Sequence, residues 1–180
     1  TSYVTLGGAI ASDVHGKNHH SAGTFGQHVK SLSIVLGTGE VVTASPQSHA
    51  DLFHATCGGM GLTGIIISAT IQLLPIRSSL ISQKTIKVDC IEAACEAFES
   101  NIDATYSVAW IDCLSKGKSL GRSVIMLGEH AEQGGLNIDI RQKFSVPFST
   151  PSGLLNTLTM KAFNTAYWHK SKHNVSQTVG

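Results

Sequence analysis

The architecture of this chain is set by residues 51–75, DLFHATCGGMGLTGIIISATIQLLP, and by the order of the elements that they encode. We predict a short helix over 48–56 that ends at a Gly-Gly pair. A long buried strand over 64–74 follows, because Ile and Thr dominate there. Residues 59–64 between them spell G-x-G-x-x-G. A dinucleotide fingerprint needs the strand before these glycines and the helix after them. The order here is the reverse, so we predict a tight helix-to-strand turn, whose glycines still let a ligand approach the backbone closely.

The rest of the chain continues in short strands and helices. Before this stretch, two β-rich runs around a glycine-containing loop predict a hairpin. After it, the apolar residues of 91–100 recur at helical spacing. The expected elements are strands at 31–36, 41–44, 80–88, 106–111 and 123–127, a helix at 91–100 and a weakly indicated helix at 154–169. Residues 133–153 show no clear pattern. The predicted class is α+β with a mixed or antiparallel sheet.

Charge and glycine divide the chain into two regions. Residues 1–76 hold five charged side chains, whereas the remaining 104 residues hold twenty. Eleven of the 18 glycines precede Ile76. We therefore predict two domains, 1–76 and 77–180, of which the first is tight and depends on glycine and the second is ordinarily solvated.

The overall composition excludes several classes of function. The 180 residues are 42% hydrophobic and 14% charged, with a formal net charge of +1. Intrinsic disorder as the main state is excluded, and no nucleic-acid surface is expected. No apolar run reaches the ~18 residues of a membrane span, and the first residues do not resemble a signal peptide, so we expect a cytoplasmic protein. The four cysteines match no zinc template, and we expect free thiols.

Four of the nine histidines lie within residues 13–20, DVHGKNHH, or close after them at His28. His15 and His19 have the i, i+4 spacing of helical metal ligands. The glycine and asparagine between them disfavour a helix, however, so we predict no metal site. Two interpretations stay open. One is a polar loop whose histidines hydrogen-bond to the backbone. The other is a loop that faces a cofactor or substrate, in which a buried His beside Lys17 is a proton or oxyanion partner.

The preceding run, TLGGAIAS at residues 5–12, contains small side chains and a glycine pair. Such a run leaves room for a flat or anionic ligand. By composition alone, a packed β-turn is the better prediction.

Residues 4–75 taken together resemble the second half of the FAD-binding domain of the vanillyl-alcohol-oxidase (PCMH-type) flavoproteins. The resemblance rests on HGKNHHSAGTFG at 15–26 and GLTGII at 61–66. Both runs are specific to a group within that family that oxidises the 2′-hydroxyl of a polyprenyl-phosphoryl pentose, in the synthesis of a cell-wall arabinose donor. The resemblance continues more loosely through YSVAWIDCLSKGKSLGRSVIMLGEH at 106–130 and YWHKSK at 167–172. The resemblance implies an oxidoreductase in which the half-domain at 1–76 precedes the start of an α+β substrate (cap) domain at 77–180.

The resemblance also implies roles for single residues. The positions that match FAD contacts are Thr5, Leu6, Gly7 and Gly8, then Ser12, Asp13, Val14 and His15, and finally Ile66. His15 and Lys17 match residues at the isoalloxazine face, where the sugar hydroxyl loses its proton to a nearby base while the cofactor performs the hard chemistry. Ser12 replaces the Cys of the most similar group, and both residues are small.

The family binds the FAD pyrophosphate upstream of the position of Thr1 and completes its active site downstream of that of Gly180. The resemblance therefore implies an internal part of a longer enzyme, inactive by itself and with FAD absent or weakly held. It implies a polyprenyl-phosphoryl sugar substrate, a reductase partner subunit, peripheral membrane contact and no nucleic-acid partner. Two other functions stay open: an alditol or aldonolactone oxidase that uses O2, and a non-catalytic domain that binds metal through its histidine loop or serves assembly.

Overall fold

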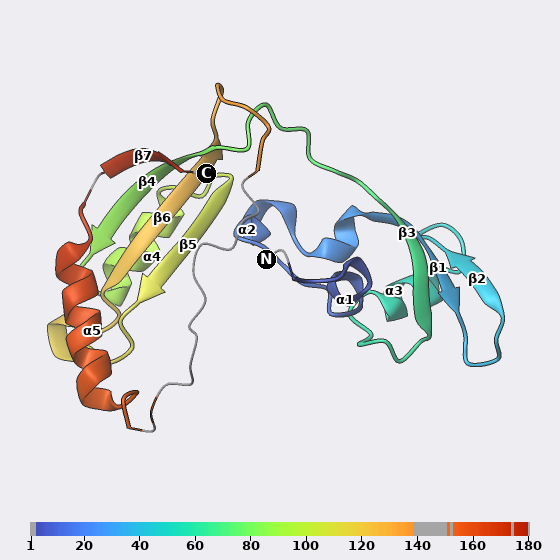
Figure 1. Cartoon of the computed structure of the whole chain (residues 1–180), viewed down its shortest axis with the longest axis horizontal. Helices are drawn as coiled ribbons and strands as arrows, with labels where there is room; N and C mark the ends of the chain where they lie inside the picture. The colour runs from blue at the N-terminus through green and yellow to red at the C-terminus, as the bar shows by residue number, and fades with distance from the viewer. Residues whose placement is uncertain (1–2, 139–150, 152, 174, 180) are drawn as a thin grey trace. The chain divides into compact units, whose positions relative to one another are not determined.

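The computed structural model of the chain describes residues 3–138, 151, 153–173 and 175–179. The chain folds into two compact units, Thr1–Pro75 and Ile76–Gly180 (Figure 1). Each unit combines one antiparallel sheet with helices, so the predicted α+β class is confirmed. Most of 133–153, where the sequence shows no pattern, lies outside the described residues.

Unit 1 is built on a three-stranded antiparallel sheet of order β2-β1-β3. The strands are β1 (Val29–Val35), β2 (Val41–Ala44) and β3 (Ile65–Ile71). The helices are α1 (Leu6–Ala11), α2 (His19–Ala22), the 3-10 turn η1 (Phe25–His28) and α3 (Ala50–Thr56). The predicted hairpin is confirmed as β1 and β2, and the helix before the glycines as α3. The core of this unit consists of Ile10, Val29, Leu32, Ile34, Ala44 and Phe53.

Two predictions for unit 1 are wrong. The strand over 64–74 is not buried throughout: β3 is a sheet edge, where Ile65 is 70% and Ile67 56% exposed. Ile66 between them packs against the core, and an apolar run by itself does not show how many faces of a strand are covered. Residues 5–12 form helix α1 rather than a β-turn, because the Thr5 hydroxyl caps it by accepting the Gly8 N–H at 3.2 Å.

Unit 2 is built on a four-stranded antiparallel sheet of order β5-β6-β4-β7. The strands are β4 (Ile81–Val88), β5 (Tyr106–Ile111), β6 (Ser123–His130) and β7 (Val175–Val179). The helices are α4 (Ile91–Glu99), the 3-10 turn η2 (Gly117–Ser119) and α5 (Thr157–Lys170). All elements predicted for this region are present within a few residues. The sequence analysis missed β7, whose short, mostly polar sequence becomes a strand by pairing with β4.

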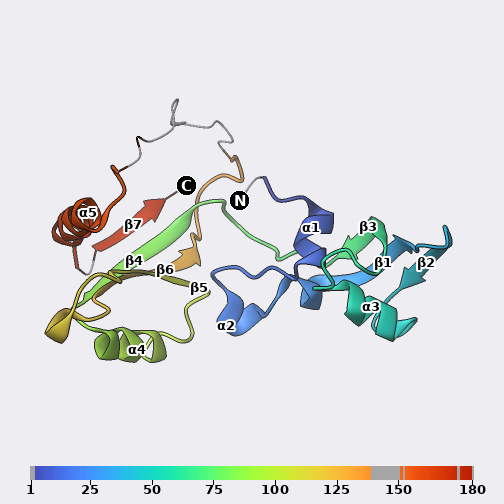
Figure 2. The ribbon, with the colours of Figure 1, turned by 90° about the horizontal axis from the view of Figure 1, so that it is seen from below.

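The two long helices of unit 2 cover opposite faces of its sheet (Figure 2). On one face, Ala94 of α4 packs with Ile125 and Leu127 of β6. On the other, Tyr167 of α5 contacts Trp110 of β5, with ring centroids 4.7 Å apart. Unit 2 is therefore a three-layer α/β/α arrangement.

Candidate cofactor site

Two glycine-rich segments of unit 1 line one open hollow of about 340 Å³. The first is α1 with the residue that follows it, and the second is the turn that leads into β3. The lining residues are Gly7, Gly8, Ala11, Ser12, Met60, Gly61, Gly64 and Ile66. Segments separated by about fifty residues in the sequence thus meet at one place.

Backbone hydrogen bonds hold the two segments together. The Gly58 N–H donates to the Ile10 carbonyl at 3.0 Å, and the Met60 N–H donates to the Ala11 carbonyl at 2.8 Å. The bond to Ala11 satisfies a carbonyl at the end of α1 that has no partner within the helix. The Ile10 carbonyl also accepts the Asp13 N–H at 3.0 Å. Gly64 is required by packing, because a Cβ there would lie 2.3 Å from the Val35 carbonyl oxygen. The shape of the hollow is therefore fixed by the backbone.

Gly7 has no such internal requirement. A Cβ at this position would meet no heavy atom within 4 Å. A Cβ at Gly61 would also meet none, but the φ of 79° at Gly61 is one that glycine adopts most readily. The packing of unit 1 therefore does not require glycine at position 7. Glycine inside a helix costs about 1 kcal/mol relative to alanine, so its presence there needs another reason. A ligand that lies against the backbone supplies one. Open backbone beside the aliphatic side chain of Ile66 and the 70% exposed Met60 fits a flat ring system such as a flavin.

The hollow gathers four of the nine positions expected to contact FAD: Gly7, Gly8, Ser12 and Ile66. The other five do not line it: Thr5, Leu6, Asp13, Val14 and His15. Sequence reasoning missed Ala11, Met60, Gly61 and Gly64 as lining residues. The G-x-G-x-x-G run marked the last two as places of close backbone approach, but their partner segment is visible only in the fold.

Asp13 has a structural role in its loop. Its carboxylate accepts the Gly26 N–H at 2.7 Å and so ties the segment after α1 to η1. The backbone of Asp13 has a positive φ of 42°.

Burial, and secondarily the Asp13 charge, raises the pKa of the neighbouring Cys57 thiol, so Cys57 is a poor nucleophile.

His15 and Lys17 are both exposed, which corrects the prediction of a buried histidine beside a lysine. His15 forms a β-bridge with Thr24, and its ring centroid lies 4.7 Å from that of His19. The ring of His28 makes a 3.0 Å hydrogen bond to the Ala22 carbonyl, as the backbone-bonded interpretation of the loop expects. Within the described ranges, no three His, Cys, Asp or Glu side chains are grouped as metal ligands.

Comparison with known proteins shows which enzymes this chain resembles. No protein-family model matches the chain. Decaprenylphosphoryl-β-D-ribose oxidase of Mycolicibacterium smegmatis is 39% identical over 95% of this chain and 40% of its own length. An FAD-linked oxidoreductase of Aspergillus niger, pynB, is 40% identical over 42% of this chain and 14% of its own length. The chain is related to FAD-linked oxidoreductases. Cytokinin dehydrogenase 9 of Oryza sativa is 38% identical over 41% of this chain and 14% of its own length.

The chain spans less than half the length of the curated relatives that it matches over most of its own length, 40% and 44%. No helix in the described part of the chain is long and apolar enough to cross a bilayer. These relatives and the hollow lead to one hypothesis, since four of the nine positions where the sequence analysis expects the cofactor line the hollow.

Proposed function

We propose that the hollow of unit 1 forms part of an FAD site, and that the enzyme containing it oxidises the 2′-hydroxyl of a polyprenyl-phosphoryl pentose. The observation that carries this proposal is Gly7, a helical glycine that the packing of unit 1 does not require and that lines the same hollow as Gly61 and Ile66. The substrate class is supported by the mycobacterial relative, which is similar to almost the whole chain. Unit 1 is then the second half of an FAD-binding domain, and unit 2 the start of a substrate domain.

The residues of this chain bind and position, and they handle one proton. FAD, when bound, supplies the two-electron redox chemistry. Gly7 and Gly61 leave room for it, and Ile66 provides an apolar contact. In the exposed loop, we propose that an imidazole nitrogen of His15 accepts the proton of the sugar hydroxyl. The Lys17 ammonium stabilises the negative charge that develops on that oxygen.

Flavin binding tests the first half of the proposal. In protein produced from the complete reading frame that encodes this chain, Gly7→Leu fills the hollow while keeping a good helix former in α1. We expect FAD affinity to fall by about tenfold or more, since the ring would lose its contact with the backbone. Gly37→Leu is the matched control, because a Cβ at Gly37 also meets nothing within 4 Å but lies in the β1–β2 loop. The measurement is a titration of FAD followed by flavin absorbance. Unchanged affinity in Gly7→Leu contradicts the proposed site.

Substrate oxidation tests the second half. Under anaerobic conditions, a short-chain polyprenyl-phosphoryl ribose is expected to bleach the flavin, and its 2′-deoxy analogue is not. His15→Gln and Lys17→Gln should slow the bleaching by about 10²–10⁴-fold without releasing FAD. His54→Gln is the control, because this exposed histidine lies on α3, outside the lining of the hollow. If the ribose lipid leaves the flavin oxidised while an alditol reduces it and O2 is consumed, the alditol oxidase alternative replaces this proposal.

A further inference from the structure

Unit 2 contains a second pocket, of about 420 Å³, between the face of its sheet that α5 covers and the C-terminal end of that helix. Its lining comes from four strand and helix elements and from the segment that joins α5 to β7. The lining residues are Gln83, Thr85, Val124, Met126, Tyr167, Lys170, Ser171, Lys172, Val175 and Gln177. The volume falls within the ~300–1,000 Å³ typical of small-ligand sites.

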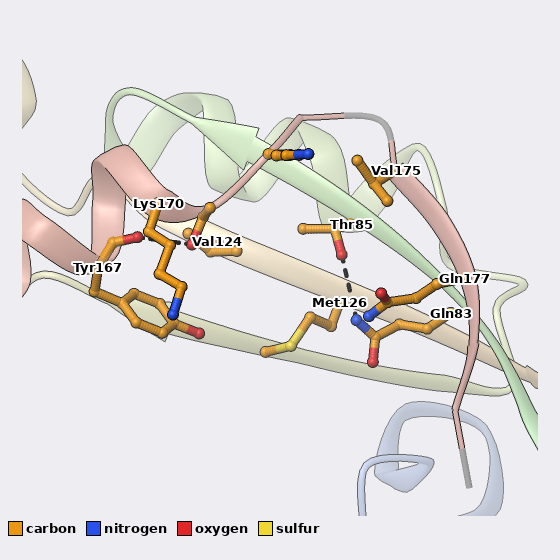
Figure 3. A pocket seen from close by; sticks show the side chains of 10 residues that line it. Gln83, Thr85, Val124, Met126, Tyr167, Lys170, Val175 and Gln177 are labelled. Carbon is orange, nitrogen blue, oxygen red and sulfur yellow. Dashed lines mark hydrogen bonds between the residues drawn. The ribbon is translucent and has the colours of Figure 1, made fainter.

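The pocket has an aliphatic floor with polar groups at both ends. In Figure 3, Lys170 extends alongside Tyr167 at one end, Gln83 and Gln177 lie at the other, and Met126 is between them. Gln83 is held in place, because its amide Nε2 donates to the Thr85 hydroxyl at 3.3 Å. The floor is continuous with the buried side chain of Val124.

Positive charge dominates this pocket. Lys170 and Lys172 are exposed, and neither forms an ion pair with any described residue. None of the lining residues is acidic. A third cation is close by, since the Lys87 ammonium lies 4.2 Å from the ring centroid of Trp168 on α5. The buried carboxylate of Asp112, which accepts a hydrogen bond from Asn164 of α5, is already paired with Arg122 at 2.7 Å. The unpaired lysines therefore favour an anionic ligand.

We propose that this pocket binds a phosphate-bearing amphiphile, with the phosphate on Lys170 and Lys172 and the first part of the hydrocarbon chain over Met126 and Val124. Lysine and phosphate form charge-assisted hydrogen bonds, and an aliphatic floor gains free energy by covering apolar ligand surface. Neither a free sugar nor a free inorganic phosphate uses both features. This inference deepens the proposed function, because a polyprenyl-phosphoryl sugar joins these two chemistries in one molecule.

The test measures binding without turnover, so it does not depend on the redox proposal. Farnesyl phosphate, farnesol and inorganic phosphate are titrated by calorimetry into protein from the complete reading frame. We expect farnesyl phosphate to bind more tightly than either of the others. The double variant Lys170→Gln/Lys172→Gln should lose about tenfold or more in affinity for farnesyl phosphate, whereas Lys170→Arg/Lys172→Arg should retain binding.

The matched control is Lys116→Gln/Lys118→Gln, which removes the same charge from exposed positions of unit 2 outside the pocket. Because Lys170 stands in the last turn of α5, where a cation also offsets the helix dipole, the melting temperature of each variant is measured to confirm folding. Equal losses in the two glutamine double variants would show a general charge effect and overturn the proposal. Equal binding of farnesol and farnesyl phosphate would also overturn it.

The failures of the two proposals differ in what they show. If the ribose lipid bleaches the flavin equally well in the wild type and in Lys170→Gln/Lys172→Gln, the proposed function stands and the pocket assignment is wrong. If farnesyl phosphate binds as expected but no polyprenyl-phosphoryl sugar reduces the flavin, the pocket stands and the substrate of the proposed function is wrong.

Discussion

The buried carboxylate of Asp112 connects the end of β5, the start of β6 and α5 through hydrogen bonds. It pairs with Arg122 at 2.7 Å and accepts the Ser115 hydroxyl and the Asn164 amide, each at 2.6 Å, and the Leu114 N–H at 3.1 Å. Burial raises the pKa of Asp112, but the four hydrogen-bond donors outweigh it and lower that pKa to about 2. The charged form is therefore the one that stabilises unit 2.

Replacing this charge should be costly. In Asp112→Asn, an amide group would face the donors of Arg122 and Ser115, and Arg122, only 16% exposed, would lose its counter-charge. We expect a loss of about 3 kcal/mol in the free energy of unfolding of unit 2, measured by urea denaturation. Asp103→Asn, which removes the same charge from an exposed position, should change it by less than about 0.5 kcal/mol.

The same carboxylate predicts a pH dependence. The folded-state pKa of Asp112 lies below the ordinary value of 3.8. The contribution of this carboxylate to the free energy of unfolding is therefore complete above pH 3.8 and is lost as the pH falls toward about 2. Over that range, the stability of the wild type should decline more steeply than that of Asp112→Asn. Parallel declines in the two proteins would show that Asp112 is not the titrating group.

Among the elements, β3 is an apolar strand with one packed face and one exposed face. Ile66 packs on the core of unit 1 and lines the hollow, whereas its neighbours Ile65 and Ile67 are exposed at the sheet edge. Exposed apolar side chains on an unpaired strand edge promote association between molecules.

Replacing isoleucine with threonine should have different effects on the two faces of β3. Ile66→Thr should cost about 2 kcal/mol of stability, because it replaces a packed ethyl group with a hydroxyl. Ile67→Thr should change stability by less than about 0.5 kcal/mol and reduce self-association. Urea denaturation and analytical ultracentrifugation measure the two effects. A similar loss of stability in both variants would contradict the exposure of this edge.

At the scale of the whole molecule, the two units have cores with no residue in common. Mutations in separate cores should therefore act independently. We expect Asp112→Asn to accelerate amide hydrogen exchange in β5 and β6 of unit 2 and to leave β1 of unit 1 unchanged, as measured by mass spectrometry. Conversely, Ile66→Thr should affect β1 and spare β6. Faster exchange in both units from either substitution would show that the two cores unfold together.

Much of this protein is encoded locally. The hairpin of β1 and β2, helices α3 and α4, strands β4, β5 and β6 and the α+β class follow from periodicity and glycine placement, because those signals depend on neighbouring residues. Helix α5 was only weakly indicated, yet its start is a capping box in which Asn156 accepts the N–H groups of Leu158 and Thr159. The rejection of a dinucleotide fingerprint also needed no more than the order of helix and strand.

Tertiary structure decided what the sequence did not. The hollow joins Gly7 to Gly61, the Asp112 carboxylate joins β5 to α5, and β7 is a strand only beside β4. Which face of β3 is covered, and whether His15 is buried, likewise depended on packing. Periodicity reports the local conformation of the backbone, whereas burial, ion pairing and the lining of a pocket depend on contacts between residues far apart in the chain. For that reason the sequence determined most elements of this protein and its relationship to flavoenzymes, and the fold determined which of the expected residues meet.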